Sequence, residues 1–308
     1  MSGEAPLALT GGSGFVGQAV LDVLADRNLP AGALVRRVTE HGHSRVEWIN
    51  GDLGNKRALD HLVAGARAVV HVAGLTNTPD PAEFQAANVT GTAQLIAAAR
   101  QAGTKRFIFV SSLSAREPQL SAYGASKADA EKLVEDSGLD WTIVRPPAVY
   151  GPRDRDMFEL FRTAGFGFVP LPPGGATSII HAHDLARLLV DLVDAQPALV
   201  RRRTFEPDDG REGGWSHKEL ADAIGQAMGK RVYAPHLPRG VLQGAAAVDR
   251  LLRGAGAKLT RDRVGYMCHP NWVARSDRKV PDTVWQPRIG GEAGLKATAE
   301  WYRSQGWL

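Results

Sequence analysis

The stretch L-A-L-T-G-G-S-G-F-V-G, from Leu7 to Gly17, decides the fold. A short apolar run ends at Thr10 in a glycine-rich turn, and apolar residues then recur with helical spacing. Gly11 permits the tight turn, Gly14 lets a pyrophosphate approach the backbone, and the last glycine lets helix and strand pack closely. A glycine trio also suits an ordinary loop, but the strand before it and the helix after it favour a dinucleotide-binding turn. The cofactor contacts expected here are Thr10, Gly11, Ser13, Gly14, Phe15, Val16 and Gly17.

The composition is that of a globular protein. The chain has 308 residues, of which 44% are hydrophobic and 23% charged, enough for a large α/β domain with a smaller lobe. The formal net charge is +4. Because acidic and basic residues are interspersed, we expect no nucleic-acid partner, although a mildly basic chain suits a phosphorylated ligand.

The sequence also indicates the compartment in which the protein is expected. Cys268 is the single cysteine, so no intrachain disulfide can form, and we expect a reducing, cytoplasmic compartment. No signal peptide is visible before the first strand. No apolar run reaches the roughly 18 residues of a membrane span. The nearest candidate, residues 241–252, is interrupted by Gln243, Asp249 and Arg250, and we expect an amphipathic helix that packs inside the protein.

The first half of the chain alternates between strands and helices. This alternation predicts a Rossmann-type, doubly wound parallel sheet with helices on both faces, and ligands bind beyond the carboxyl ends of such strands. The expected strands are 7–9, 32–36, 46–49, 68–72, 107–110 and 141–145, and the expected helices run to Asp26 and over 56–64, 88–101 and 122–135.

The second half differs in character. Ser216 and Glu219 form the S-x-x-E pattern of a capping box, which opens a helix over 218–228. Five of the seven tryptophans lie beyond residue 200, and we expect them mainly in the core of a smaller, mostly helical C-terminal substrate lobe. The predicted division assigns residues 1–152 and about 178–208 to the dinucleotide-binding domain, and about 153–177 and 209–308 to the lobe.

The end of the second strand indicates which cofactor binds. An acidic residue there binds the ribose 2′-hydroxyl of NAD, whereas arginine accommodates the 2′-phosphate of NADP. Arg36 and Arg37 occupy this position, so we expect NADP(H), with NAD(H) possible if both arginines are only solvated. Asp52 follows the third strand and suits the adenine amino group, or alternatively caps a helix over 54–64.

A helix over 122–135 carries the candidate catalytic pair. Tyr123 and Lys127 are four residues apart and therefore lie on one helix face. An ammonium nearby stabilises a phenolate and lowers the pKa of a tyrosine. Ser112 follows a strand and can direct its hydroxyl to the same sheet edge. Tyr and Lys at this spacing also occur as ordinary surface pairs, but the serines before them and the glycine turn favour catalysis.

These motifs resemble the extended short-chain dehydrogenases/reductases, which include the NAD(P)-dependent epimerases/dehydratases, the carbonyl reductases and the hydroxysteroid dehydrogenases. The resemblance covers roughly residues 7 to 190 and is closer to the reductases. It rests on T-G-G-S-G-F-V-G (10–17), G-D-L (51–53), H-V-A-G (71–74), N-V-T-G-T (88–92), V-S-S (110–112), Y-G-A-S-K (123–127), R-P-P-A-V-Y-G-P (145–152) and H-A-H-D-L-A (181–186).

The resemblance implies roles for individual residues. Tyr123 would be the acid–base group, Lys127 would lower its pKa and hold the nicotinamide ribose, Ser112 would orient a carbonyl, and Asn88 would support the site. Further cofactor contacts are implied for Asp52, Leu53, Ala73, Gly74, Ser111, Tyr123, Lys127 and Pro146.

Two departures from the nucleotide-sugar enzymes narrow the chemistry. The linker from Ser112 to Tyr123 is short, and the residues after the serine, 113–115, include no acid. The family's sugar dehydratases need a carboxylic acid there, so we expect no dehydratase activity. The apolar, tryptophan-rich second half favours a substrate less polar than a nucleotide sugar.

Several other polar residues suggest structural roles. His41 and His43 lack further ligands, so we expect no metal. His181 and His183 are expected to make a structural hydrogen bond, and residues 201–203 to form a solvated loop.

The leading hypothesis is an NADP(H)-dependent oxidoreductase that transfers a hydride between nicotinamide and a ketone or secondary alcohol of a small, fairly apolar substrate. One alternative is a nucleotide-sugar epimerase with tightly held NAD(P), and another is a non-catalytic dinucleotide-binding subunit. A homodimer through helices 88–101 and 122–135 is implied by the resemblance.

Overall fold

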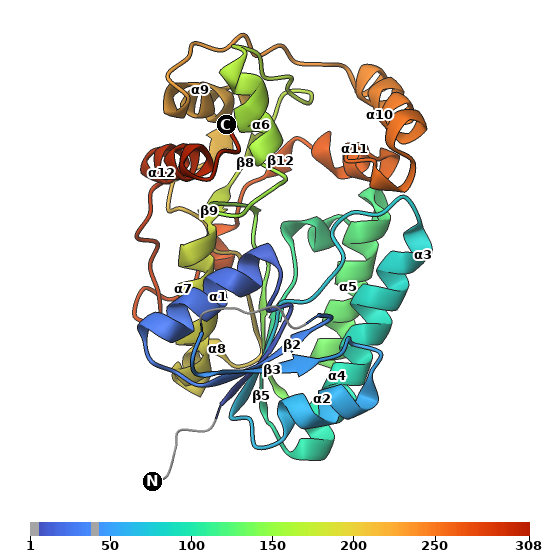
Figure 1. Ribbon diagram of the computed structural model, residues 1–308, viewed down its shortest axis with the longest axis vertical. Coiled ribbons are helices and arrows are strands. Elements are labelled where there is room, and N and C mark those ends of the chain that lie inside the picture. The colour runs from blue at the N-terminus through green and yellow to red at the C-terminus, as the bar shows by residue number, and fades with distance from the viewer. Residues whose placement is uncertain (1–5, 38–42) are drawn as a thin grey trace.

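A seven-stranded parallel sheet forms the centre of the protein, whose computed structural model describes residues 6–37 and 43–308 (Figure 1). The strand order is β10-β6-β5-β4-β1-β2-β3, and the predicted Rossmann-type fold is confirmed. The strands are β1 Leu7–Thr10, β2 Ala31–Val35, β3 Val46–Asn50, β4 Ala68–His71, β5 Arg106–Val110, β6 Asp140–Val144 and β10 Arg203–Phe205.

Helices cover both faces of this sheet, because each presents an apolar side to it. On one face, α1 (Phe15–Asp26) and α7 (Ala182–Asp194) pack together over β1 and β5. On the other lie α2 (Lys56–Val63), α4 (Gly91–Ala102) and α5 (Ala122–Glu135). The helix expected over 88–101 begins differently: a π-helical turn, Gln85–Thr90, joins the short helix α3 (Pro81–Phe84) to α4. Figure 1 shows these helices on either side of the strands.

The remaining elements lie beyond the carboxyl ends of the strands (Figure 1). A three-stranded sheet, β11-β8-β12, and a pair, β7-β9, carry the chain into them. Whether this group is a separate domain with the predicted boundaries stays a prediction. The elements are β7 Ala148–Tyr150, α6 Phe158–Gly165, β8 Ala176–Thr177, β9 Ile179–His181, β11 Trp215–Ser216, α9 His217–Ala227, α10 Arg239–Arg253, α11 Arg261–Met267, β12 Asn271–Trp272 and α12 Gly291–Ser304. The short helix α8 (Pro197–Val200) instead leads into β10 at the opposite edge of the main sheet (Figure 1).

Apolar packing and one helix cap hold this second group together. Trp215 is buried in a core formed mainly by α6, α9 and α12, and Trp272 is also buried. Trp285, however, packs in the main core beside α7. The predicted capping box is present: Ser216 Oγ accepts from the Glu219 N–H at 3.1 Å, and the glutamate accepts in return from the Ser216 N–H at 2.8 Å.

The packing of helix α10 differs from the expectation for residues 241–252. The segment forms the predicted amphipathic helix, but it does not pack inside the protein. Its buried residues are Leu242 and Ala246, whereas the side chains of Leu251 and Leu252 are 84% and 77% exposed. A helical pattern shows which residues share a side, but not which side the rest of the chain covers. Within the two described ranges, no helix is long and apolar enough to cross a membrane.

A buried histidine joins three elements at the carboxyl edge of the sheet. His71, at the end of β4, contacts Thr10 Oγ1 through Nδ1 at 2.7 Å and Thr92 Oγ1 through Nε2 at 2.9 Å. The Thr10 hydroxyl also accepts from the Ala73 N–H at 3.1 Å. Burial, with a smaller effect of Lys127, lowers the pKa of His71 from 6.5 to about 3. The ring is therefore neutral at physiological pH.

This histidine predicts a pH dependence of stability. Between pH 6.5 and 3 the unfolded chain takes up a proton that folded His71 does not, so acidification favours unfolding. Lowering the pH from 7 to 5 should cost about 2 kcal/mol of unfolding free energy through this residue alone. A His71→Gln variant should be less stable at pH 7. Its unfolding free energy should fall by correspondingly less when the pH is lowered to 5. Urea unfolding at both pH values measures the difference, and an identical loss in the two proteins would contradict a neutral His71.

Candidate active site

The turn between β1 and α1 is shaped for an anionic ligand. Gly11 has a φ of +75°, and a Cβ on Gly17 would lie 2.0 Å from the Gly11 carbonyl oxygen. Gly14 precedes the first turn of α1, and no side chain caps that helix. Its first N–H groups are therefore available to a phosphate, and the helix dipole favours negative charge there. These features fit the pyrophosphate of a dinucleotide; Ser13 lies in this turn, and Phe15 and Val16 begin α1. The buried Thr10 hydroxyl is instead held by His71 and Ala73.

Three residues expected to contact the adenosine half lie at the ends of β2 and β3. Arg36 and Arg37 are exposed directly after β2. Asp52 is exposed after β3, and its Oδ1 accepts from the Gly54 N–H at 2.9 Å. The alternative that Asp52 caps α2 is wrong, because Asn55 holds that position and accepts from the Ala58 N–H at 3.1 Å. Leu53, next in the chain, packs against Gly91 of α4.

The predicted catalytic residues converge at the end of β5. Tyr123 and Lys127 are both buried on α5, which begins where Ser121 Oγ accepts from the Gly124 N–H at 2.9 Å. The Lys127 ammonium donates to the Val110 carbonyl at 2.8 Å. The Ser112 side chain, two residues further along the chain, lies near enough to the Tyr123 hydroxyl to lower its pKa. Two hydroxyl groups therefore meet at one point, with an ammonium group on the same helix face.

The pKa of Tyr123 differs from the expectation. Burial raises it to about 12, and the side chain of Ser112 opposes that rise. The expected net lowering of this pKa is therefore absent in the protein without cofactor, because desolvation of the phenolate dominates. Whether Lys127 stabilises the phenolate stays a prediction. Burial also lowers the pKa of Lys127 to about 8. At neutral pH the phenol is protonated and the amine largely charged, which suits proton donation.

The side chain of Asn88 connects the loop after β4 to α5 by hydrogen bonds. Its side-chain amide donates to the Leu75 carbonyl at 3.0 Å and to Ser126 Oγ at 2.9 Å, and its oxygen accepts from the Leu75 N–H at 2.7 Å. A Cβ at Gly74 would lie 3.2 Å from both the Asn88 oxygen and the Lys127 nitrogen. Asn88 sits in the π-helical turn, a distortion that often marks functional sites. Its contacts are those of a positioning residue.

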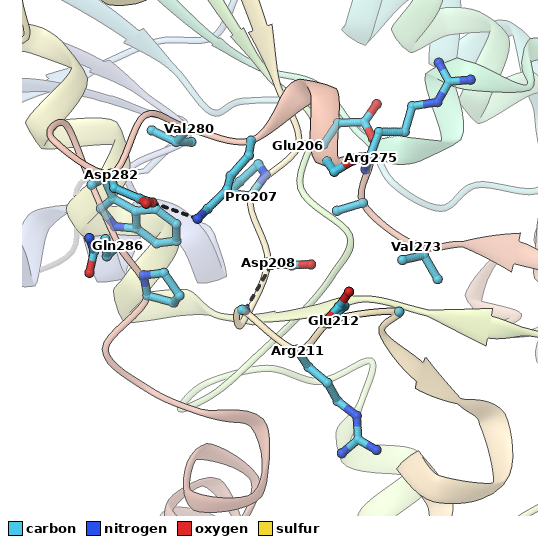
Figure 2. Close-up of a pocket in the computed structure, with 17 residues that line it drawn as sticks. Glu206, Pro207, Asp208, Arg211, Glu212, Val273, Arg275, Val280, Asp282 and Gln286 are labelled. Atoms are coloured by element: carbon cyan, nitrogen blue, oxygen red, sulfur yellow. Dashed lines mark hydrogen bonds and ion pairs between the residues drawn. The ribbon is translucent and has the colours of Figure 1, made fainter.

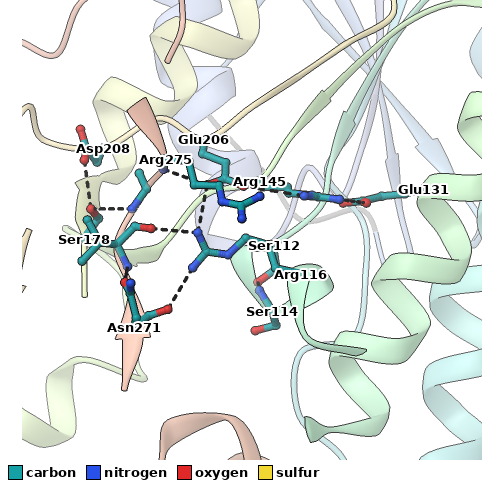
Figure 3. Close-up of polar contacts among 12 residues, drawn as sticks. Ser112, Ser114, Arg116, Glu131, Arg145, Ser178, Glu206, Asp208, Asn271 and Arg275 are labelled. Carbon is teal, nitrogen blue, oxygen red and sulfur yellow. Dashed lines mark hydrogen bonds and ion pairs between the residues drawn. The ribbon is translucent and has the colours of Figure 1, made fainter. Parts of the chain in front are cut away.

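A buried charge network lies directly behind the site and was missed by sequence reasoning (Figure 3). Glu131 accepts from Arg145 at 2.8 and 2.5 Å and from Ser111 Oγ at 2.5 Å. The Ser111 hydroxyl, expected at the cofactor, is thus directed to this carboxylate. Glu131 follows Lys127 by four residues, as Lys127 follows Tyr123, and this spacing was the available signal.

The network continues into the second group of elements. Glu206, whose side chain is fully buried, lies 3.7 Å from Arg145 and 3.2 Å from Arg116. Arg116 also donates to the carbonyls of Val273 and Asn271 at 2.9 and 3.0 Å. Figure 3 shows the arginine reaching from the loop after Ser112 to these backbone oxygens. The position of the loop after Ser112 is therefore tied to residues more than 150 positions away.

Apolar rings form the wall around Tyr123. The Phe84 ring lies 5.8 Å and the Tyr266 ring 6.2 Å from its centroid. Tyr266 belongs to α11, and this helix is held over α5 because Asp262 accepts from the Ala122 N–H at 2.5 Å. On the opposite side, Pro146 accepts from the Leu113 N–H at 3.1 Å. Charge is also present: Arg263 donates to the Tyr266 hydroxyl at 3.2 Å, and Arg263 and Asp156 both affect the pKa of Tyr123. The two rings suit the apolar part of a substrate.

A cavity of about 500 Å³ lies between the loop 206–213 and the segment 273–287 (Figure 2). Its walls mix acidic and basic side chains, among them Asp208, Glu212 and Lys279, and include none of the predicted catalytic residues. It borders the site through Glu206 and Val273, both of which are bonded by Arg116.

The histidines have structural roles where they are described. His181 Nδ1 accepts from the His183 N–H at 3.2 Å and caps α7, which confirms the expected structural bond. His43 lies 3.7 Å from Asp22, and His41 falls outside the described residues. In the described part of the chain, no group of side chains could hold a metal ion.

Comparisons with known proteins agree with this geometry. A family model described as NAD(P)H-binding matches residues 11–196. A ceramide reductase from Caulobacter vibrioides is 36% identical over 98% of this chain and 96% of its own length. A 2-alkyl-3-oxoalkanoate reductase from Stenotrophomonas maltophilia is 28% identical over 94% of this chain and 97% of its own. The structure of UDP-glucose 4-epimerase from Thermus thermophilus in complex with NAD shares the fold, with a TM-score of 0.71 at 21% identity, covering 97% of this chain and 99% of that one. The chain belongs to the NAD(P)H-binding family and, within it, is an NAD(P)-dependent oxidoreductase of the extended short-chain dehydrogenase/reductase type.

Proposed function

We propose that this protein is an NADP(H)-dependent reductase that converts the ketone of an alkyl-chain lipid into a secondary alcohol. The observation that carries the proposal is the meeting of the Ser112 and Tyr123 hydroxyls beside Lys127, with the phenol protonated at neutral pH. The name of the 2-alkyl-3-oxoalkanoate reductase supports an oxo group as the reacting group and a substrate with an alkyl chain. The ceramide reductase supports a lipid substrate. The apolar rings beside Tyr123 are compatible with such a substrate.

The residues divide the reaction between them. When bound, the reduced nicotinamide supplies the hydride that reduces the carbonyl carbon. Ser112 donates a hydrogen bond to the carbonyl oxygen, which stabilises the charge that develops there. Tyr123 transfers its phenolic proton to this oxygen, and the Lys127 ammonium stabilises the phenolate that remains. We further propose that the protein is cytoplasmic and that it forms a homodimer through α4 and α5.

Removal of the phenolic hydroxyl tests the assignment. Tyr123→Phe should lower kcat by about 10²- to 10⁴-fold, because the proton donor is lost, while the affinity for NADPH stays unchanged. The matched control is Tyr266→Phe, which removes a hydroxyl from the neighbouring ring and should retain most of the turnover. Loss of nicotinamide absorbance with a long-chain ketone measures turnover, and cofactor titration measures affinity. Full activity of Tyr123→Phe would refute the role.

The same assay distinguishes a reductase from an epimerase. A reductase consumes NADPH in proportion to the alcohol formed. Cofactor that stays bound through purification, with no net change in nicotinamide absorbance during turnover of a nucleotide sugar, would contradict the proposal.

The cofactor preference is tested at the end of β2. The proposal assigns the 2′-phosphate to Arg36 and Arg37, because a guanidinium pairs with phosphate in a fork. Replacing both with glutamine should raise the Kd for NADPH roughly 10- to 100-fold, the effect of losing charged hydrogen bonds, with little effect on NADH. Arg45→Gln removes a charge before β3, at the other end of the strands, and serves as the control. An equal loss of affinity for both cofactors would contradict the preference.

A further inference from the structure

Exposed apolar side chains are concentrated at one end of the molecule. Among the described residues, all but one of the exposed large hydrophobic side chains lie in two segments, 166–168 and 233–252; the exception is Leu308. Phe166 and Tyr233 are 82% and 71% exposed. The ring of Phe168 lies 6.3 Å from that of Tyr233. These segments adjoin α6 and α10, at the end of the protein distant from the main sheet (Figure 1). Nearly all of this exposed apolar area therefore lies at one end of the molecule, in the Phe168–Tyr233 pair with its neighbour Phe166 and on α10.

Helix α10 supplies the aliphatic part of the region. Its inner side packs Leu242 and Ala246 against α11. Val241, Val248 and Leu252 recur at spacings of seven and four residues and therefore share another side of the helix. Val241 and Val248 are both more than half exposed. We call the exposed side chains of α10, together with Phe166, Phe168 and Tyr233, the tip surface.

The tip surface is also strongly basic. Residues 229–256 contain five lysines and arginines and one acid, a net charge of +4 that equals the charge of the whole chain. The single acid, Asp249, is engaged by Arg253 at 3.3 Å and by the backbone N–H groups of Lys258 and Leu259 at 2.8 Å. Arg239 and Arg250 are exposed on the same helix. Cationic and apolar side chains on one helix are the combination that binds an anionic membrane surface.

We propose that the tip surface docks on an anionic phospholipid bilayer, with α10 lying in the plane of the interface. A second copy of the chain fits less well, because pairing two tip surfaces would bring two segments of charge +4 together. The cationic side chains are complementary to anionic headgroups, and the apolar ones enter the boundary between headgroups and acyl chains. No spanning segment is needed.

The position of α10 connects this surface with catalysis. Its inner side contacts α11, and α11 carries Tyr266, the ring beside Tyr123. One helix therefore lies between the tip surface and the catalytic residues. The link to catalysis rests on the proposed function: a ketone-bearing lipid held in the bilayer would meet the protein at the side where its active site is covered by α10 and α11.

Sedimentation with vesicles tests the proposal on the full chain. The probes are vesicles of phosphatidylcholine alone and vesicles that also contain phosphatidylglycerol. Binding to the anionic vesicles should exceed binding to the neutral ones and should weaken as salt is added. Replacing Leu251 and Leu252 with serine should lower partitioning roughly 10- to 100-fold, since their burial in the interface is lost. Leu308→Ser, which changes the exposed leucine outside the tip surface, should leave partitioning unchanged.

A second variant separates charge from apolar burial. Arg239→Gln with Arg250→Gln should reduce binding to anionic vesicles by about 30-fold and remove much of its salt dependence, with no effect on neutral vesicles. All these side chains are exposed, and unchanged thermal unfolding verifies that the variants fold.

The outcomes keep the two proposals distinguishable. Turnover of a short, water-soluble ketone should be the same in every tip variant, so failure of the proposed function shows as absent turnover with vesicle binding intact. Equal binding of the wild type and the leucine variant, or no binding to anionic vesicles, would overturn the docking proposal. So would a dimer, measured by light scattering, that forms through Leu251 and Leu252 in place of vesicle binding.

Discussion

The burial of the Lys127 ammonium is the constraint on which the site depends. The group lies 2.8 Å from the Val110 carbonyl and 4.9 Å from the Phe109 ring. A buried charge is costly unless it finds partners, and both of these partners belong to β5. Helix α5 is therefore fixed against the end of that strand, and Tyr123, one turn earlier, is fixed with it. Burial of the same helix face keeps the tyrosine protonated.

The next turn of α5 extends this arrangement to the rest of the molecule. Glu131 is bonded by Arg145, which directly follows β6, and the arginine also faces Glu206 after β10. Neighbouring strands of the sheet thus contribute to one line of alternating charges. Such buried pairs contribute little net stability compared with apolar residues, but removal of one partner leaves an uncompensated charge. Their effect here is to fix the geometry of the elements that carry the site.

Local spacing was sufficient for much of the site to be predicted. The turn from Leu7 to Gly17 and the pair Tyr123 and Lys127 are each encoded within a few residues, and the structure places them at the same sheet edge. Glu206 and Arg116 were not predicted, because they are 90 residues apart and meet only through the fold. The direction of the Tyr123 pKa was missed for a related reason: its cause is burial by distant segments such as α11.

The exposure of α10 shows a different limit of structure prediction from the sequence. Periodicity predicted the helix and its amphipathic character, but the helix has apolar residues on more than one side. Only the small contact with α11 shows which of these sides the rest of the protein covers. A pattern in one segment cannot reveal whether the remaining chain is long enough, or folded suitably, to cover a second apolar side.

Arg116 and Glu206 have a mechanical consequence for substrate entry. Glu206 accepts from the Arg275 N–H at 3.0 Å, and Arg116 bonds to the carbonyls on either side of Trp272. Hinge-like separation of the two parts of the protein would strip several partners from buried charges at once. The α10–α11 pair has only a small core, centred on Leu242, Ala246 and Val264. Local opening of this helical pair would break the bonds from Asp262 to the start of α5, but it would leave the charged joint between the two parts closed.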